Sequence, residues 1–128
     1  MVCKQVIGTV ANWGLNGCTQ PAITSRASQA IDRPFPTAVG PYTATITWSN
    51  LDQQPPGTPG TTTISVNVTS PRKDKCASGS TEWQLVGSIS ANTTVPGVKG
   101  KVKIVACVST SNAVTNTLGS GGFKPARF

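Results

Sequence analysis

Residues 42–49 read Tyr-Thr-Ala-Thr-Ile-Thr-Trp-Ser and decide the fold class of this chain. Apolar side chains occupy Tyr42, Ala44, Ile46 and Trp48, and a hydroxyl side chain follows each of them. Successive side chains of a β-strand point to opposite faces of the sheet, so this alternation gives the segment one apolar and one polar face. The stretch therefore predicts a half-buried β-strand.

The same alternation recurs in three later segments. It predicts strands over residues 63–69, 83–90 and about 98–110, with apolar positions at Ile64, Val66 and Val68, at Trp83, Leu85 and Ile89, and at Val102, Ile104, Ala106 and Val108. Prolines and glycines between residues 50 and 60 predict an exposed loop that joins the first two of the four strands as a hairpin. Gly87 is expected to mark a bulge.

The first third of the chain is less regular. Residues 2–10 fit a strand, and the glycine-containing residues 12–17 predict a turn after it. Residues 19–39 hold three prolines and predict a long ordered connection, with a single helical turn at Ser25 to Ile31.

The composition agrees with a β fold. The chain has 128 residues, the size of one domain, and is 37% hydrophobic but only 12% charged, so it lacks the residues that fill exposed helical faces. Alternating strands without helical crossovers predict a single antiparallel β-sandwich, of jelly-roll or immunoglobulin-like topology, with long loops. We expect the sandwich to cover residues 1–118 and residues 119–128 to form an extended C-terminal arm on a glycine hinge.

Four cysteines form an even set that allows two disulfides in three possible pairings. We expect Cys3 to pair with Cys18, which closes a short loop, and Cys76 to pair with Cys107, which joins two neighbouring segments. Free buried thiols are the alternative. A metal site is disfavoured because the chain has no histidine and no Cys-x-x-Cys pair.

The residues of the common catalytic classes are missing from the sequence. The absence of histidine removes the Ser-His-Asp and Cys-His arrangements. The four acidic residues are scattered, mostly in predicted loops, and no glycine motif for a phosphate group is present. We therefore expect no enzymatic activity and no cofactor. No segment approaches the roughly 18 apolar residues of a membrane-spanning helix.

Positive charge is the clearest binding feature. The chain has 11 basic and 4 acidic residues and a net charge of +7, which favours an acidic protein surface or nucleic acid as the partner. Lysines at every second residue of the last predicted strand should project from one face and form a basic stripe: Lys99, Lys101 and Lys103. Three cations of an earlier loop are expected to extend this stripe: Arg72, Lys73 and Lys75. The alternative is that these side chains only maintain solubility and prevent edge-to-edge pairing.

Aromatic residues supply two further candidates. The C-terminal tail has apolar and basic side chains after the glycine hinge: Phe123, Lys124, Arg127 and Phe128. We expect these residues to form an assembly arm that docks on this domain's own sheet or on a neighbouring subunit. Trp13 and Tyr42 are candidates for a sugar-binding platform, although we favour core packing for both.

These features favour a non-enzymatic structural protein of a virion, such as a phage capsid or capsid-decorating subunit, that binds copies of itself or other structural subunits. The alternative is a secreted or cell-surface module, held rigid by two disulfides, that binds glycan or matrix. A single-strand nucleic-acid binder that uses the basic stripe is the third hypothesis, and an aromatic content of only 5% weakens it.

Overall fold

The computed structural model describes residues 1–19, 28–49, 60–70, 76–77, 79–90, 100–118 and 122–128, and all regular secondary structure in these ranges is β. The strands are β1 (Val2–Gly8), β2 (Trp13–Cys18), β3 (Ser28–Ile31), β4 (Gly40–Ser49), β5 (Gly60–Thr69), β6 (Thr81–Ile89), β7 (Lys101–Val108), β8 (Val114–Thr115) and β9 (Ala126–Arg127). The alternating segments thus become the four longest strands, β4 to β7.

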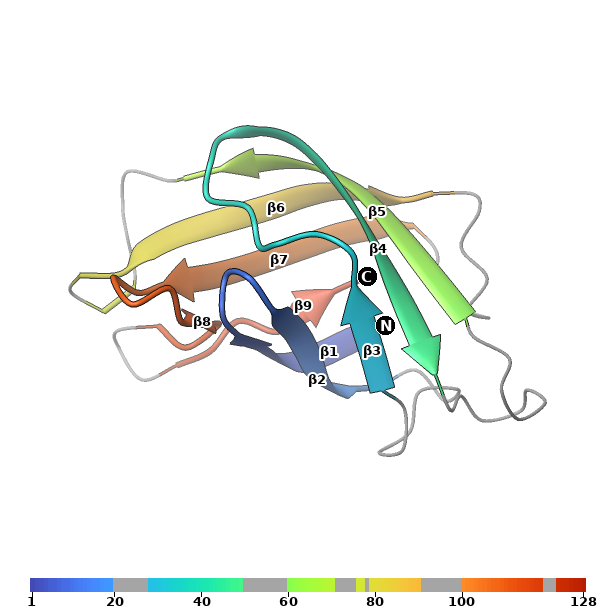
Figure 1. Ribbon diagram of the computed structural model, residues 1–128, viewed down its shortest axis with the longest axis horizontal. Helices are drawn as coiled ribbons and strands as arrows, with labels where there is room; N and C mark the ends of the chain where they lie inside the picture. The colour runs from blue at the N-terminus through green and yellow to red at the C-terminus, as the bar shows by residue number, and fades with distance from the viewer. Residues whose placement is uncertain (20–27, 50–59, 71–75, 78, 91–99, 119–121) are drawn as a thin grey trace.

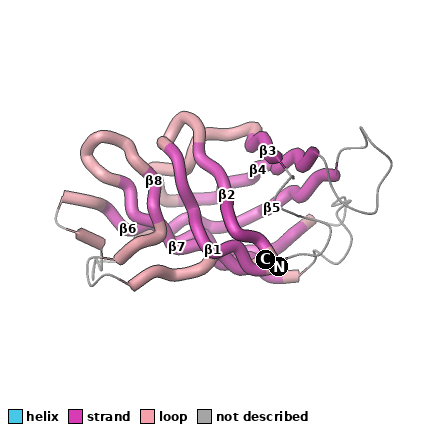
Figure 2. Tube along the Cα trace, turned by 90° about the horizontal axis from the view of Figure 1, so that it is seen from below, coloured by secondary structure: helices cyan, strands magenta, loops and turns pink. Residues whose placement is uncertain are grey.

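The strands form one antiparallel sheet that curls almost into a closed barrel. Their order is β2-β1-β9-β7-β6-β5-β4-β3, and β8 pairs with β7 beside this path. In Figure 1 the long strands β4 to β7 form one wall, and Figure 2 shows β1, β2 and β8 crossing in front of it. The all-β antiparallel prediction is confirmed, but the predicted sandwich is wrong, because a single sheet bends round and covers its own apolar face.

The barrel interior is the hydrophobic core. Most inward positions of the four alternating segments are buried as predicted, including Ile46, Ile64, Leu85 and Ile104. The exceptions are half-buried and pack against the core: Tyr42, Trp83 and Ile89. Trp48 is also buried, and its indole N–H donates a 3.1 Å hydrogen bond to the hydroxyl of Thr62, so neither polar group lacks a partner inside the core.

Two strands occupy segments for which the sequence predicts other structure. Residues 13–18 form β2 and not a turn; the chain reverses earlier, where Thr9 and Asn12 exchange backbone hydrogen bonds of 3.2 and 3.1 Å. The predicted helical turn is also wrong over residues 28–31, because these residues form β3 and pair with β4. Residues 25–27 lie outside the described part of the chain, as do residues 50–59 of the predicted loop.

Gly87 serves close packing of two strands and does not mark a bulge. The ladders on both sides of β6 keep constant register through this residue, which lies opposite Val66 on β5 and Val102 on β7. A Cβ atom at Gly87 would lie 2.0 Å from the carbonyl oxygen of Ser65. Only glycine fits here, because β5 and β6 approach too closely for any side chain.

The side chain of Gln29 joins the two ends of the sheet. The amide of Gln29 on β3 bonds to both backbone groups of Leu15 on β2: its Oε1 accepts a 2.9 Å bond from the Leu15 N–H, and its Nε2 donates to the Leu15 carbonyl. We call this contact the β2–β3 seam. The primary amide of Gln29 thus replaces the peptide group of a strand partner at this point.

In its described residues the C-terminal segment is a strand of this domain's own sheet, which is one of the two docking positions expected for the arm, and not a free extension. Strand β9 lies between β1 and β7, with Cys3 opposite Ala126 and Lys103 opposite Arg127. Phe128 is 8% exposed and lies in the core. Its backbone N–H donates to the Met1 carbonyl at 2.8 Å, and the terminal ammonium group of Met1 donates to the Phe128 carbonyl at 2.9 Å.

Both predicted disulfides are confirmed. Cys3 is bonded to Cys18 across β1 and β2, and Cys76 is bonded to Cys107 on β7. Disulfides persist in oxidising compartments, so the pair indicates an extracellular or secreted environment. Among the described residues there is no helix of the length and apolar character needed to cross a membrane.

Candidate functional site

Two lysines of the predicted basic stripe lie on the outer face of the barrel. Lys101 and Lys103 are exposed on β7, and the residues that alternate with them, Val102 and Ile104, face the core. On the same outer side Val105 and Cys107 are buried, so the exposed part of β7 ends at Lys103. The other predicted members, Lys99, Arg72, Lys73 and Lys75, lie outside the described residues.

The register of the sheet adds a cation that the sequence assigned to an arm. Arg127 on β9 is exposed and lies directly opposite Lys103, and on the other side of Lys103 lies Val86 of β6, which is 48% exposed. We call the surface of Lys101, Lys103, Arg127 and Val86 the cationic face. Like charges directly opposite each other on neighbouring strands repel, so an anion from outside the chain would stabilise this arrangement.

The acidic side chains that the structure describes do not neutralise the cationic face. There are two of them, and each accepts a hydrogen bond elsewhere: Asp32 from the backbone N–H of Thr45 at 2.7 Å, and Glu82 from the side-chain amide of Gln84 at 3.4 Å. Within the described ranges, no group of three or more potential metal ligands occurs. The cationic face is therefore a candidate site for electrostatic binding.

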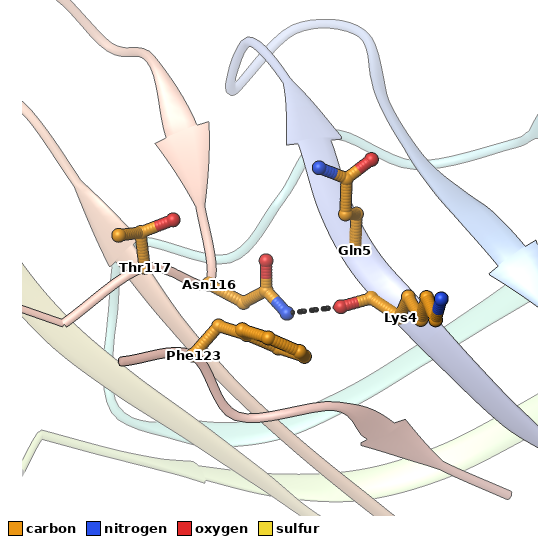
Figure 3. Close-up of a pocket in the computed structure, with 5 residues that line it drawn as sticks. All are labelled: Lys4, Gln5, Asn116, Thr117 and Phe123. Carbon is orange, nitrogen blue, oxygen red and sulfur yellow. Dashed lines mark hydrogen bonds between the residues drawn. The ribbon is translucent and has the colours of Figure 1, made fainter. Parts of the chain in front are cut away.

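A pocket of about 250 Å³ lies between β1 and the segment that leads from β8 to β9. Its lining residues, shown in Figure 3, are Lys4, Gln5, Asn116, Thr117 and Phe123. Backbone bonds hold the aromatic wall in place: Thr117 and Phe123 form a bridge, the Leu118 N–H donates to the Gly122 carbonyl at 2.7 Å, and the Lys124 N–H donates to the Asn116 carbonyl at 3.1 Å.

Asn116 connects the two sides of this pocket. It is only 3% exposed, and its Nδ2 donates to the carbonyl of Lys4 at 2.7 Å and to the carbonyl of Lys124 at 2.9 Å. These two bonds fix the amide, and in Figure 3 its oxygen points into the open space between Thr117 and Gln5. No described residue donates a hydrogen bond to that oxygen, so the pocket holds one oriented acceptor.

Trp13 does not present an open ring. It is buried, its indole N–H donates to the Arg33 carbonyl at 3.0 Å, and its ring packs edge-on against Phe35 with the centroids 5.2 Å apart. Tyr42 is half-buried beside it, and its hydroxyl donates to the Pro34 carbonyl at 2.8 Å. Burial raises the pKa of Tyr42 to about 12. Core packing, the favoured alternative, is therefore right for Trp13, whereas Tyr42 is only partly buried against the core.

No pattern in the sequence predicts this pocket. Its walls come from segments more than a hundred residues apart, and neither Asn116 nor Thr117 belongs to a recognisable motif. The one signal in the sequence is Phe123, an apolar side chain in a glycine-rich stretch without an apolar pattern around it. Of the predicted arm residues, Phe123 and Arg127 reach candidate sites, Phe128 lies in the core, and Lys124 is exposed and contributes its backbone to the pocket.

Comparisons of the chain with protein-family models, with curated proteins and with solved structures gave no match. The functional proposals below therefore depend on the residues and geometry of this chain.

Proposed function

We propose that the protein is a non-enzymatic assembly protein that docks on an acidic protein surface through the cationic face. The observation that supports this proposal is the direct opposition of Lys103 and Arg127 on neighbouring strands, while the two described acidic side chains, Asp32 and Glu82, accept hydrogen bonds elsewhere. Carboxylates of a partner would remove the repulsion between the two cations and add charge-assisted hydrogen bonds.

The composition of the face suits a protein partner better than a nucleic acid. Exposed Val86 lies next to Lys103, and protein interfaces combine apolar side chains with arginine. Binding to single-stranded nucleic acid relies on stacked aromatic rings, and no aromatic residue belongs to the cationic face. The net charge of +7 would also speed the approach to an acidic partner.

The setting that we propose is a structural assembly such as a virion, in which small domains pack against neighbouring subunits. Two disulfides fit a particle that must persist in an oxidising medium. The expected locking arm no longer supports this setting, since Phe128 fills the core of its own chain. The proposal depends instead on the surface charge.

The test is the affinity of the disulfide-intact protein for poly-L-glutamate, used as an acidic polypeptide probe. Lys103→Glu should weaken binding about tenfold, or about 1.4 kcal/mol, because the new carboxylate pairs with Arg127 and neutralises it as well. Arg33→Glu is the matched control, since it makes the same charge change at an exposed residue whose backbone, and not its side chain, bonds to Trp13.

Two results would contradict the proposal. Equal losses for Lys103→Glu and Arg33→Glu would show that only net charge matters. A higher affinity for single-stranded DNA than for poly-L-glutamate at the same ionic strength would favour the nucleic-acid hypothesis instead.

A further inference from the structure

We infer that the pocket lined by Lys4, Gln5, Asn116, Thr117 and Phe123 recognises the acetamido group of a neutral N-acetylated sugar. This site uses none of the side chains of the cationic face, and the inference goes beyond the docking function proposed above. Three features of the pocket support this ligand class: a buried acceptor without a donor, an oriented donor that faces it, and an exposed aromatic ring.

The buried acceptor is the amide oxygen of Asn116. This residue is only 3% exposed, and its Nδ2 already donates to the carbonyls of Lys4 and Lys124. The oxygen receives no hydrogen bond from a described residue, and it points into the open space of the pocket in Figure 3. A buried acceptor that lacks a donor costs free energy, so a ligand N–H that meets this oxygen would bind favourably.

The oriented donor is the amide nitrogen of Gln5. The Gly17 N–H donates a 2.9 Å bond to the Asn16 Oδ1, and the Asn16 Nδ2 donates a 3.0 Å bond to the Gln5 Oε1. These bonds determine which end of the Gln5 amide carries the oxygen. The other end, Nε2, is directed toward the open space above the Asn116 oxygen in Figure 3. Its hydrogens have no described partner and can donate to a ligand carbonyl.

The exposed ring belongs to Phe123. Its side chain is 56% exposed, whereas Phe35 and Phe128 are buried in the core. The bridge to Thr117 and the backbone hydrogen bonds on either side hold the ring at the surface. In Figure 3 the ring lies beside the Asn116 amide, on the side away from Gln5. A methyl group placed against this ring would remove apolar surface from water.

An acetamido group matches this arrangement. In a trans secondary amide the N–H and the C=O point in opposite directions, and the methyl group of an acetamide lies on the same side as the N–H. The pocket has the acceptor of Asn116 and the ring of Phe123 on one side and the donor of Gln5 on the other. The ligand N–H would therefore meet Asn116, the methyl group Phe123, and the carbonyl Gln5.

Charge and size narrow the class further. The Lys4 side chain lies against Gly17 and points away from the other lining residues in Figure 3, so Lys4 brings only its backbone to the pocket. The other lining side chains are uncharged, which favours a neutral ligand. A volume of about 250 Å³ falls below the roughly 300 to 1,000 Å³ of sites for larger ligands, which suits one sugar residue. The Thr117 hydroxyl can bond to a hydroxyl of that sugar.

The experiment is a titration of the full, disulfide-intact chain with the methyl glycosides of N-acetylglucosamine and N-acetylgalactosamine, followed by amide chemical shifts. We expect at least one of them to give saturable shifts at the pocket residues, with a dissociation constant on the order of 1 mM, as suits a ligand with few atoms. The corresponding methyl glucoside or methyl galactoside should bind at least about tenfold more weakly, because it lacks the acetamido group.

Two exposed substitutions test the two sides of the pocket. Phe123→Ala should weaken binding of the acetamido sugar about tenfold, and Phe123→Tyr, which keeps the ring, should preserve it. Gln5→Glu should also weaken binding about tenfold, because it retains an oxygen for Asn16 but replaces the donor by a carboxylate oxygen. Asn67→Asp is the matched control: it makes the same change from amide to carboxylate at an exposed residue of β5, and should leave the affinity unchanged.

Three results would overturn the inference. The first is that neither acetamido sugar gives saturable shifts at the pocket, or that the counterpart without the acetamido group binds equally well. The second is that Asn67→Asp weakens binding as much as Gln5→Glu. The third is that N-acetylglycinamide binds as tightly as the sugar, which would indicate an acylated peptide as the ligand. Each of these results leaves the binding of poly-L-glutamate to the cationic face untouched.

Discussion

Replacing Gln29 with alanine should open the β2–β3 seam. The wild-type side chain makes two hydrogen bonds to the backbone of Leu15, one through its oxygen and one through its nitrogen. Each is worth about 1 kcal/mol net, so Gln29→Ala should lower the free energy of unfolding by about 2 kcal/mol. For a chain of this length the melting temperature should fall by roughly 8 °C.

Urea unfolding measures the loss of stability, and native-state hydrogen exchange identifies its origin. The Leu15 amide should exchange faster in Gln29→Ala, because its acceptor is gone. Gln29→Glu is the matched control: it retains an oxygen acceptor for the Leu15 N–H but removes the donor to the Leu15 carbonyl. Its second carboxylate oxygen would face the Leu15 carbonyl without a hydrogen between them, so it should lose at least as much stability as Gln29→Ala and yet keep the Leu15 amide protected.

The reasoning is refuted if Gln29→Ala unfolds within about 0.5 kcal/mol of the wild type and its Leu15 amide exchanges at the wild-type rate. That outcome would mean that the packing of β1 and β2 against the core holds the barrel closed without the side-chain bridge.

Two further predictions concern the interior and the half-buried tyrosine. Gly87→Ala should destabilise the protein by about 3 kcal/mol in urea unfolding, because its Cβ would lie 2.0 Å from the Ser65 carbonyl oxygen. Gly14→Ala is the control and should change stability by less than about 1 kcal/mol, since its Cβ would make only ordinary van der Waals contacts. Similar losses of stability for the two variants would contradict the prediction. Tyr42 is the single tyrosine, so an ultraviolet titration of the folded protein should show a pKa of about 12, against about 10 in urea. Because the pKa of Tyr42 is higher in the folded protein than in the unfolded one, the free energy of unfolding should be constant below about pH 10 and should fall as the pH rises toward 12. A titration midpoint near pH 10 for Tyr42 in the folded protein would refute the effect of burial.

Local sequence patterns predicted the long strands because each of these strands has one solvent-exposed face and one buried face. The alternation at residues 42–49 becomes part of β4, and three of its apolar positions, Ala44, Ile46 and Trp48, lie in the core. The sequence could not distinguish a sandwich from a barrel, because both architectures bury one face of each strand and leave the same period of two. The contact between the two ends of the sheet includes the Gln29 side chain, which nothing local marks as a strand partner.

The short strands were not predicted from the sequence, for a different reason. Strand β2 contains Gly14 and Gly17, which normally indicate turns. Here Gly17 has a φ of 65° and lies against the Lys4 side chain, so its missing Cβ serves a close contact between strands and not a chain reversal. Tertiary packing overrides local propensity at such positions.

The C-terminal residues show how the same alternation serves both the core and the surface. Ala126 and Phe128 point inward and Arg127 points outward, as the period of two requires of a strand between β1 and β7. The sequence predicts an arm here and not a strand, because a two-residue strand is too short to show an alternating pattern. Once β9 is in place, it sets Arg127 against Lys103, and the residues just before it wall the pocket with Phe123. The last six residues therefore contribute to the core, to the cationic face and to the pocket, so a large truncation here would test folding and not the function of either surface. Single exposed substitutions, such as Phe123→Ala and Lys103→Glu, are the changes that separate the two proposed activities.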